Sequence, residues 1–304
     1  MSEQVRIVEV GPRDGLQNEK TLVSAEARIA FIEALVGAGL HTVEVGAFVS
    51  PKAIPQMVNS DQVLRGVSHL PGEFHVLVPN EKGYEASQQA GARVIAVFAS
   101  ASEGFSRANI NCSVAESIER FKPVLARAKA DGVRVRGYIS CVLGCPFDGE
   151  VMPQAVVDVA KTLWDLGCYE ISLGDTIGVG TPLKARHLLR AVAGAVPMAN
   201  LAMHFHDTYG QALANLYAGM EEGARVIDSA AGGLGGCPYA PGATGNVATE
   251  DVVYMLEGMG IRTGVDMAKL LAATNEVSGL IGRPPVSRVA AALNAKMKAN
   301  GGRT

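Results

Sequence analysis

Two histidines that are one residue apart, His204 and His206, have the clearest potential for chemistry. They lie in a short apolar segment, Leu201–His206, which is followed by the turn-like residues Asp207 and Thr208. If this segment is a β-strand, its side chains alternate between two faces, so both imidazoles point the same way. Such a pair can bind a divalent cation. The alternative is two half-buried histidines that hydrogen bond to backbone carbonyls, which is the commoner role of an isolated pair.

Other polar residues lie in or directly after further apolar segments. Arg13 and Asp14 follow the first such segment, Glu44 lies within the second, Tyr138 within the fifth, and Asp175 ends the sixth. A carboxylate in an apolar strand is costly to bury without a cationic partner, and Arg13 is the obvious partner for Glu44. A purely structural Arg13–Glu44 pair remains an alternative. Asp14 alone could cap a turn, and Asp175 could simply end its strand.

A glycine-rich stretch, residues 232–246, follows the eighth apolar segment and contains Cys237 and Asn246. Its glycines make a poor scaffold but a good hinge for a lid, which favours a chemical role for Cys237 over an inert buried thiol. Asn246 could instead belong to a turn. Together with Asp14 and the two histidines, Asn246 would complete a set of carboxylate, imidazole and amide ligands. That set suits Mg²⁺ or Mn²⁺ and could accept Fe²⁺ or Co²⁺.

The elements that must position these side chains follow a repeated pattern. Five helix-like segments end in a glycine that leads directly into an apolar strand, as αβ loops of parallel sheets do. These glycines are Gly39, Gly91, Gly132, Gly167 and Gly223. The eight predicted strands are Val5–Val10, Leu40–Gly46, Glu73–Val78, Ala92–Phe98, Val133–Ser140, Cys168–Leu173, Leu201–His206 and Ala224–Ser229. Their alternation with helices favours a closed (β/α)₈ TIM barrel over an open doubly wound sheet, and places the polar residues on one rim.

Helix signals lie between the strands. Ser113-Val114-Ala115-Glu116 is a capping box that opens a helix to about Ala130, and Pro123 is expected to bend or split that helix. The other predicted helices are Ser24–Val36, Pro153–Leu166, Pro182–Ala195, Gln211–Glu222 and Asp251–Met259. Because no linker or change of composition divides residues 1–304, we expect one catalytic domain. Residues from about 265 to 304 are expected to form a helical extension packed on the barrel.

Composition excludes several classes of protein. Hydrophobic residues make up 48% and charged residues 19%, which is typical of a compact protein with a large core. The net charge of −3 argues against general nucleic-acid binding, and no apolar run reaches membrane-spanning length. Five cysteines, an odd number, and the absence of a secretory leader favour a reducing cytoplasm. Of these cysteines, Cys141 and Cys145 are expected to be structural thiols.

Several longer motifs carry a specific resemblance. They are VEVGPRDGLQNEK (8–20), FVSPK (48–52), INCS (110–113), RGYISCVLGCP (136–146), GCYEISLGDTIGVGTP (167–182), HDTYGQALAN (206–215), GLGGCPYA (233–240) and TGNVATEDVVYMLEGMGI (244–261). On these motifs the chain closely resembles the 3-hydroxy-3-methylglutaryl-CoA (HMG-CoA) lyase family, within the superfamily of metal-dependent lyase and Claisen-condensation barrels. The resemblance covers nearly the whole chain, and the glycine-rich cysteine loop is the family's own signature.

The resemblance implies a set of metal ligands and a residue that stabilises the enolate. Asp14, His204, His206 and Asn246 look like the ligands of a divalent metal, Mg²⁺ or Mn²⁺. Arg13 looks like the residue that holds the thioester carbonyl and stabilises its enolate. The group that removes the substrate's hydroxyl proton stays open between Asp14 and a metal-bound water.

The resemblance also implies roles for four further residues. Cys237 is similar to the family's catalytic cysteine, an acid/base on a loop that closes over the substrate. Glu44, Asp175 and Tyr138 match positions that orient the reacting groups and influence the rate. Phe205, between the two histidines, departs from relatives that carry cysteine there, but this position has no proposed role.

The implied reaction is the retro-Claisen cleavage of HMG-CoA to acetyl-CoA and acetoacetate, which belongs to leucine degradation and ketone-body formation. Three alternatives remain at this stage: a lyase for a longer-chain 3-hydroxy-3-alkylglutaryl-CoA, an acyl-CoA condensing synthase of the same superfamily, and a non-catalytic metal- or CoA-binding barrel. The resemblance further implies a homodimer. No nucleic acid or membrane partner is expected.

Overall fold

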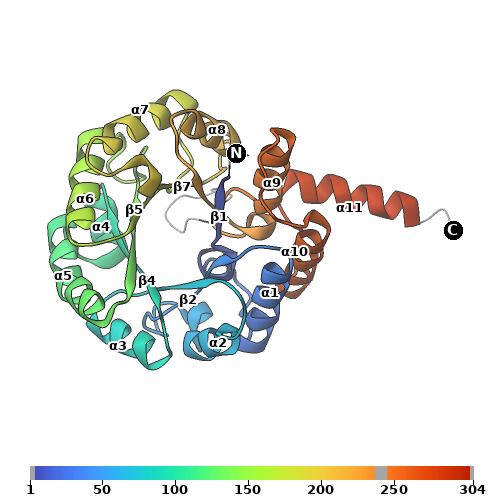
Figure 1. Ribbon diagram of the computed structural model, residues 1–304, viewed down its shortest axis with the longest axis horizontal. Coiled ribbons are helices and arrows are strands. Elements are labelled where there is room, and N and C mark those ends of the chain that lie inside the picture. Colours follow the sequence, from blue (N-terminus) through green and yellow to red (C-terminus); the bar gives the residue numbers. More distant parts are fainter. Residues whose placement is uncertain (1–3, 237–244, 302–304) are drawn as a thin grey trace.

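The computed structural model describes residues 4–236 and 245–301. Within these residues, eight strands form a closed barrel in chain order, with β8 pairing back to β1 (Figure 1). All eight neighbouring pairs are parallel. The strands are β1 (Arg6–Glu9), β2 (Thr42–Ala47), β3 (Glu73–Leu77), β4 (Val94–Ser100), β5 (Arg134–Ser140), β6 (Glu170–Asp175), β7 (Leu201–Phe205) and β8 (Val226–Ser229). The predicted TIM barrel is confirmed.

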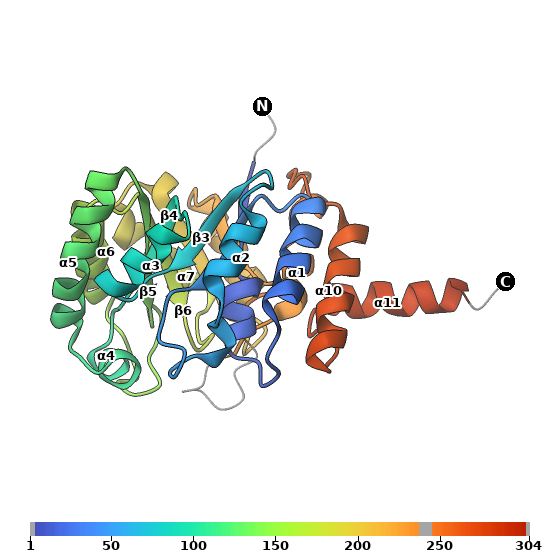
Figure 2. The same ribbon diagram turned by 90° about the horizontal axis from the view of Figure 1, so that it is seen from below.

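Helices surround the barrel and cover the outer face of its sheet (Figures 1 and 2). In the described chain, the α-helices are α1 (Ala25–Gly37), α2 (Ser60–Val67), α3 (Glu81–Gln89), α4 (Glu103–Ile110), α5 (Val114–Asp131), α6 (Pro153–Asp165), α7 (Pro182–Ala193), α8 (Ala212–Glu221), α9 (Thr249–Gly258), α10 (Met267–Ile281) and α11 (Arg288–Gly301). Because helices lie outside and side chains fill the inside, strands such as β2 and β6 are buried at every residue.

Local signals account for most of these boundaries. Ser113 makes both bonds of the predicted capping box, with Glu116, and all five predicted glycines have positive φ, from 70° to 103°. Of the two effects expected of Pro123, the split is wrong, because α5 continues through it. Short helices α2, α3 and α4 were not predicted. Each has only eight or nine residues, so packing on the barrel rather than local sequence must stabilise them.

The barrel interior holds charged residues as well as aliphatic ones. Arg136 of β5 is fully buried and forms ion pairs with Asp228 of β8 (2.6 Å) and Glu170 of β6 (2.7 Å). Both acids are almost completely buried too. Buried charges persist when they are paired and hydrogen bonded, as these three residues are.

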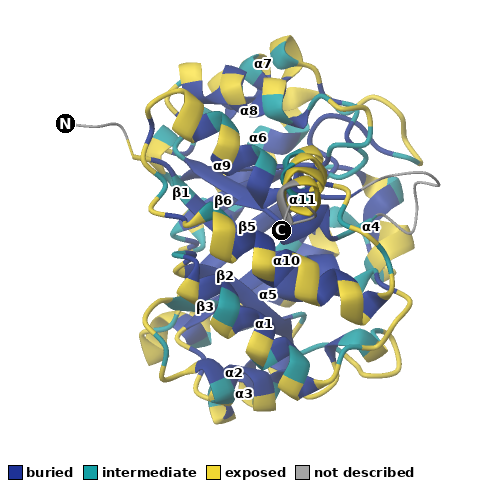
Figure 3. Ribbon diagram, turned by 90° about the vertical axis from the view of Figure 1, so that its right-hand side faces the viewer, coloured by how far each residue is buried: buried dark blue, intermediate teal, exposed yellow. Residues whose placement is uncertain are grey.

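The last two helices differ in how they meet the barrel. α10 packs against α1 and α9, as expected for an extension on the outside. In contrast, α11 contacts α9 and then projects from the body, with most of its residues exposed (Figures 2 and 3). Its sequence has few large apolar side chains, so it has little surface to bury against the barrel. No helix in residues 4–236 and 245–301 is long and apolar enough to cross a membrane.

Candidate active site

The connection after β1 is a single π-helical turn, η1 (Gly11–Gly15), and it carries Arg13 and Asp14. The Arg13 guanidinium lies between two carboxylates. Its Nε and Nη2 donate to Glu44 Oε2 at 2.7 and 2.6 Å, and its Nη1 donates to Asp14 Oδ1 at 2.7 Å. Glu44 is completely buried and Arg13 nearly so. The predicted Arg13–Glu44 pair is therefore present, and it fixes the positively charged Arg13 guanidinium at the mouth of the barrel.

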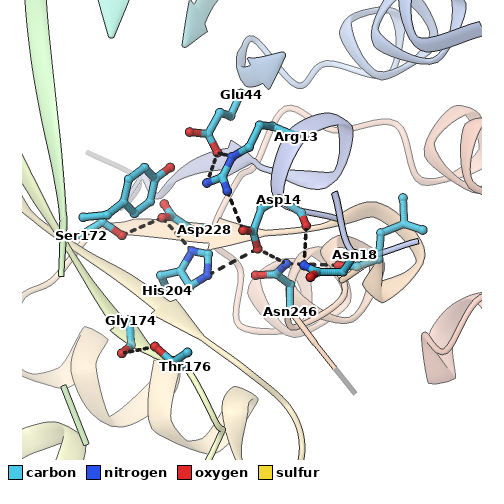
Figure 4. Close-up of polar contacts among 12 residues, drawn as sticks. Arg13, Asp14, Asn18, Glu44, Ser172, Gly174, Thr176, His204, Asp228 and Asn246 are labelled. Atoms are coloured by element: carbon cyan, nitrogen blue, oxygen red, sulfur yellow. Dashed lines mark hydrogen bonds and ion pairs between the residues drawn. The ribbon is translucent and has the colours of Figure 1, made fainter. Parts of the chain in front are cut away.

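Asp14 lies beside His204 at the C-terminal ends of the strands (Figure 4), and His206 belongs to the same group. Each of these three residues offers a ligand atom, and the three atoms lie within 4.8 Å of one another. His204 lies on β7 with its Nε2 3.9 Å from Asp14 Oδ2, and the ring centroids of His204 and His206 are 5.4 Å apart. The structure thus gathers three of the four predicted ligands into one group.

Asn246 joins this group through its side chain and its backbone. Its Nδ2 donates to Asp14 Oδ2 at 2.8 Å and to the Leu234 carbonyl at 3.1 Å. Its backbone forms an isolated antiparallel bridge with His206. The carbonyl oxygen of the same amide is the atom that a cation would use. All four predicted ligands therefore lie side by side, although they come from positions up to 232 residues apart.

The charges of the group suit a divalent cation. Burial opposes ionisation of Asp14, but the positive charges of Arg13 and the histidines outweigh it and lower its pKa to about 2. Burial lowers the pKa of His206 to about 4, so its imidazole is neutral at pH 7. Its buried Nδ1 has no hydrogen-bond partner of normal geometry among the described residues. An ionised carboxylate and a neutral imidazole are the forms that bind metals.

Asp228 is a site residue that the sequence reasoning missed. It accepts a hydrogen bond from His204 Nδ1 at 3.2 Å, and it is itself held by Arg136 and by Ser172 Oγ at 2.7 Å. Although burial opposes it, the Arg136 charge lowers the pKa of Asp228, so this carboxylate can only accept. His204 Nδ1 must then carry the hydrogen, and Nε2 faces Asp14. The signal was the same as for Glu44: an acidic residue inside an apolar strand.

Tyr138 lies beneath the group, between two arginines. Its hydroxyl accepts from Arg136 Nη1 at 2.7 Å, while the Arg13 guanidinium carbon lies 5.7 Å from its ring centroid. The ring of His204 packs edge-on against it at 5.9 Å. Burial raises the pKa of Tyr138 well above its ordinary value, so the phenol stays neutral. Tyr138 therefore contacts the buried Arg136 ion pairs on one side and Arg13 and His204 on the other.

The Asp175 side chain contacts the β6–α7 loop rather than this group. Its carboxylate accepts the backbone N–H groups of Val179 (3.1 Å) and Gly180 (2.8 Å), which orders the β6–α7 loop. Burial raises its pKa to about 6. Its neighbours Gly174 and Thr176 line the adjoining cavity, whereas Asp175 does not. The position of Asp175 therefore fits an indirect influence on the site through this loop.

A cavity of about 410 Å³ opens beside the four-residue group. Arg13, Asp14, His204 and His206 form part of its wall. The rest of the lining includes the apolar side chains of Val49, Ala53, Ile54, Leu77, Phe98, Phe105, Ile110 and Ile139. Gly236 also lines it, while the next residue, Cys237, lies outside the described residues. The site can therefore hold an organic molecule with one charged, oxygen-rich end and one apolar or neutral part.

Comparisons with known proteins agree on one family. The family model described as HMGL-like matches residues 4–277. The chain is 56% identical to the 3-hydroxy-3-isohexenylglutaryl-CoA/hydroxy-methylglutaryl-CoA lyase of Pseudomonas aeruginosa, covering 97% of this chain and 99% of the relative. It is 54% identical to the hydroxymethylglutaryl-CoA lyase of Pseudomonas mevalonii, covering 97% and 98% of the two chains.

Solved structures give the same result. The crystal structure of the hydroxymethylglutaryl-CoA lyase from Pseudomonas aeruginosa matches with a TM-score of 0.95, 56% identity and coverage of 97% of this chain and 99% of the other. An HMG-CoA lyase from Acinetobacter baumannii, in complex with coenzyme A and 3-methylmalate, matches with a TM-score of 0.91 and 36% identity over 95% of each chain.

Proposed function

We propose, since this chain belongs to the HMGL-like family, that it is a carbon–carbon lyase that cleaves HMG-CoA to acetyl-CoA and acetoacetate. The observation that carries this proposal is the placement of the Arg13 guanidinium beside the Asp14, His204 and His206 group at a cavity of about 410 Å³. Curated relatives with 53–56% identity over nearly the full chain carry the name of this activity.

Asp14, His204, His206 and Asn246 would hold a divalent cation, for which we propose Mg²⁺ or Mn²⁺. The donor set of one carboxylate, two imidazoles and one amide supports this choice, and so does the low pKa of Asp14, about 2. When bound, such a cation acidifies an alcohol and orients a hydroxy acid. One nitrogen of each histidine and one carboxylate oxygen of Asp14 lie within 4.8 Å of one another, which supports coordination of a single ion by all three residues.

The reaction requires a proton to leave the C3 hydroxyl of the substrate. As the C2–C3 bond breaks, its electron pair moves to C2 and forms the enolate of acetyl-CoA, while C3 becomes the ketone of acetoacetate. Arg13 would stabilise the enolate oxygen, because its guanidinium is already fixed by Glu44 and Asp14 and needs no reorganisation. Asp14 is a candidate base for the hydroxyl proton. Tyr138 and Glu44 would keep Arg13 in place.

Protonation of the enolate carbon would complete the reaction. We assign this step to Cys237 from the family resemblance alone. A general acid in that position contributes typically about 10²–10⁴-fold to the rate.

The first test is a coupled assay for acetyl-CoA and acetoacetate formed from HMG-CoA. Wild type is expected to cleave the substrate with Mg²⁺ or Mn²⁺ and to stop with EDTA. Replacing the cysteine (Cys237→Ala) should lower kcat by about 10²–10⁴-fold while Mn²⁺ binding persists. Absence of cleavage by folded wild type that has bound Mn²⁺ would rule out HMG-CoA as the substrate.

A second candidate substrate is 3-hydroxy-3-isohexenylglutaryl-CoA, which the name of the Pseudomonas aeruginosa relative includes. The apolar wall of the cavity supports it, because a longer 3-alkyl chain needs such a surface. The kcat/KM values for the two thioesters, measured side by side, decide between them. A higher value for the longer thioester would make HMG-CoA the secondary substrate.

We also propose that the protein is cytoplasmic and forms a homodimer. Cys112, Cys145 and Cys168 are buried thiols that form no disulfide among the described residues, which supports a reducing compartment. The homodimer rests on family resemblance, and sedimentation equilibrium would test it.

A further inference from the structure

Glu9, the last residue of β1, is a buried carboxylate that the proposed reaction does not use. It is fully buried, and within the described chain it has no ion pair with an arginine, lysine or histidine. Its three hydrogen-bond partners are all neutral. Oε1 accepts from the backbone N–H of Gly11 (2.8 Å) and of Ala231 (2.9 Å), and Oε2 accepts from Thr249 Oγ1 (2.6 Å). Burying a carboxylate without a cationic partner costs free energy of folding, so a residue of this type is not needed for packing alone.

The three partners begin three different segments around the metal-ligand group. Gly11 is the first residue of η1, which carries Asp14. Ala231 begins the short 3₁₀ turn η4 (Ala231–Gly233), and Thr249 begins α9, three residues after Asn246. One carboxylate therefore joins the segment of one candidate ligand to the segment of another.

Further contacts close this arrangement into a ring. Asn246 Nδ2 donates both to the carbonyl of Leu234, which follows η4, and to Asp14 Oδ2. The path runs from Glu9 through η4 and Leu234 to Asn246 and Asp14, and returns through η1 to Glu9. Since every link is a hydrogen bond of ordinary length or a short stretch of chain, a shift of η1 against η4 would change the separation of Asp14 and Asn246.

Two glycines leave the space that this ring requires. A Cβ at Gly11 would lie 2.6 Å from Glu9 Oε1, and a Cβ at Gly15 would lie 2.6 Å from Leu234 Cβ. Gly11 does not have positive φ, so its backbone conformation alone would allow alanine. The position instead excludes a side chain because the Glu9 carboxylate approaches the backbone of η1 so closely.

We propose that Glu9 is a positioning residue for the metal centre: it sets the distance between Asp14 and Asn246 by holding η1, η4 and the start of α9 on one carboxylate. This inference rests on the proposed metal site. Residues that orient metal ligands typically change metal affinity by roughly 10–100-fold when they are replaced.

Glu250 provides a matched control. It is also fully buried, and it accepts the backbone N–H of Gly232, the residue next to Ala231, at 3.0 Å from both carboxylate oxygens. Its other partner is Thr274 on α10. Glu250 therefore anchors the same turn, η4, but it ties that turn to the outside of the barrel and makes no described contact with η1.

The test measures Mn²⁺ affinity by electron paramagnetic resonance of free Mn²⁺, together with thermal unfolding. Wild type is compared with Glu9→Met, Glu9→Gln, Gly11→Ala and the control Glu250→Met. Methionine fills the space but offers only a weak sulfur acceptor, whereas glutamine keeps an oxygen acceptor for both backbone N–H groups. We expect Glu9→Met and Gly11→Ala to weaken Mn²⁺ binding by roughly 10–100-fold, while Glu9→Gln and Glu250→Met stay near wild type.

The possible outcomes separate this inference from the proposed function. If wild type binds no Mn²⁺, the metal centre and the role of Glu9 both fall. If wild type binds Mn²⁺ and folded Glu9→Met or Gly11→Ala binds it equally well, only the role of Glu9 is overturned. Equal losses in Glu9→Met and Glu250→Met would also overturn it, because they would show general loosening of η4. If Glu9→Met does not fold, the Mn²⁺ affinity of Gly11→Ala, which keeps the Glu9 carboxylate, decides whether the role of Glu9 stands.

Discussion

At the scale of single residues, the site depends on charges that are buried with their partners already in place. Arg13 contacts Glu44 through two nitrogens and Asp14 through a third, so its guanidinium cannot rotate away. In water the same groups would need to be ordered during each turnover. Fixed charge of this kind is what stabilises an enolate without reorganisation.

Arg13→Lys should retain the positive charge and lose most of the activity. Lysine cannot reproduce the planar contacts to Glu44 and Asp14, so its ammonium will not stay at the enolate position. We expect kcat for HMG-CoA cleavage to fall by about 10²–10³-fold, with a smaller change in KM. Steady-state kinetics at saturating Mn²⁺ checks this. A kcat within a factor of a few of wild type would mean that charge alone suffices.

Asp228→Asn should weaken metal binding through His204. The asparagine has one acceptor where Asp228 has two, and it leaves Arg136 with less compensating charge, so His204 Nδ1 loses its fixed partner. We expect Mn²⁺ affinity to fall by roughly 10–100-fold. Ser172→Ala is the control, because it removes another bond to Asp228 and leaves His204 untouched. Similar losses in the two variants would argue against an orienting role.

At the scale of elements, the αβ loops determine how each helix returns to the barrel. Gly39, between α1 and β2, and Gly167, between α6 and β6, both have φ of +102°. They differ in their surroundings. A Cβ at Gly39 would overlap the backbone carbonyl of Gly264, which leads into α10, whereas a Cβ at Gly167 would meet nothing within 4 Å. The loop at Gly39 is therefore packed against the segment that leads into α10, whereas the loop at Gly167 has space for a Cβ.

Gly39→Ala should destabilise the protein more than Gly167→Ala. Both variants incur backbone strain of about 1–3 kcal/mol, but only Gly39→Ala must also displace the Gly264 backbone. We expect an additional loss of about 1–3 kcal/mol, as for other overpacked sites. Urea unfolding of the two variants measures the difference. Equal losses would show that the contact between Gly39 and Gly264 yields without cost.

At the scale of the whole molecule, buried acids make stability depend on pH. Burial raises the pKa of Glu250 to about 7, above the value of about 4.5 expected in the unfolded chain. The folded state therefore favours the neutral carboxyl. As pH rises from about 4.5 to about 7, this carboxyl ionises in the unfolded chain but stays neutral in the folded protein, so the free energy of unfolding falls.

Glu250→Gln should remove this dependence. Relative to wild type, the variant is expected to gain roughly 1–3 kcal/mol between pH 5 and pH 8, because one pKa unit corresponds to about 1.4 kcal/mol. Urea unfolding at the two pH values gives the comparison, with the exposed Glu276→Gln as the control. A constant difference between wild type and Glu250→Gln would show that Glu250 keeps its charge in the folded state.

The sequence alone determined the barrel and most of the reactive residues. Glycines at helix ends and short apolar strands repeat often enough to specify a parallel barrel, whose geometry brings all strand ends to one rim. Glu44 and His204 could be identified because they lie within apolar segments, and Asp14 because it follows one. Asn246 could be identified from its place in the glycine-rich stretch after the last segment. Family resemblance then supplied the proposed roles, including that of Cys237.

Only the tertiary structure decided which groups hold these residues in place. Asp228 and Glu9 act across 24 and up to 240 residues of sequence, through hydrogen bonds that no local pattern specifies. Likewise, α5 continues through Pro123 because its packing on the barrel outweighs the local preference of proline. A sequence records which side chains are present, whereas barrel closure determines which of them meet.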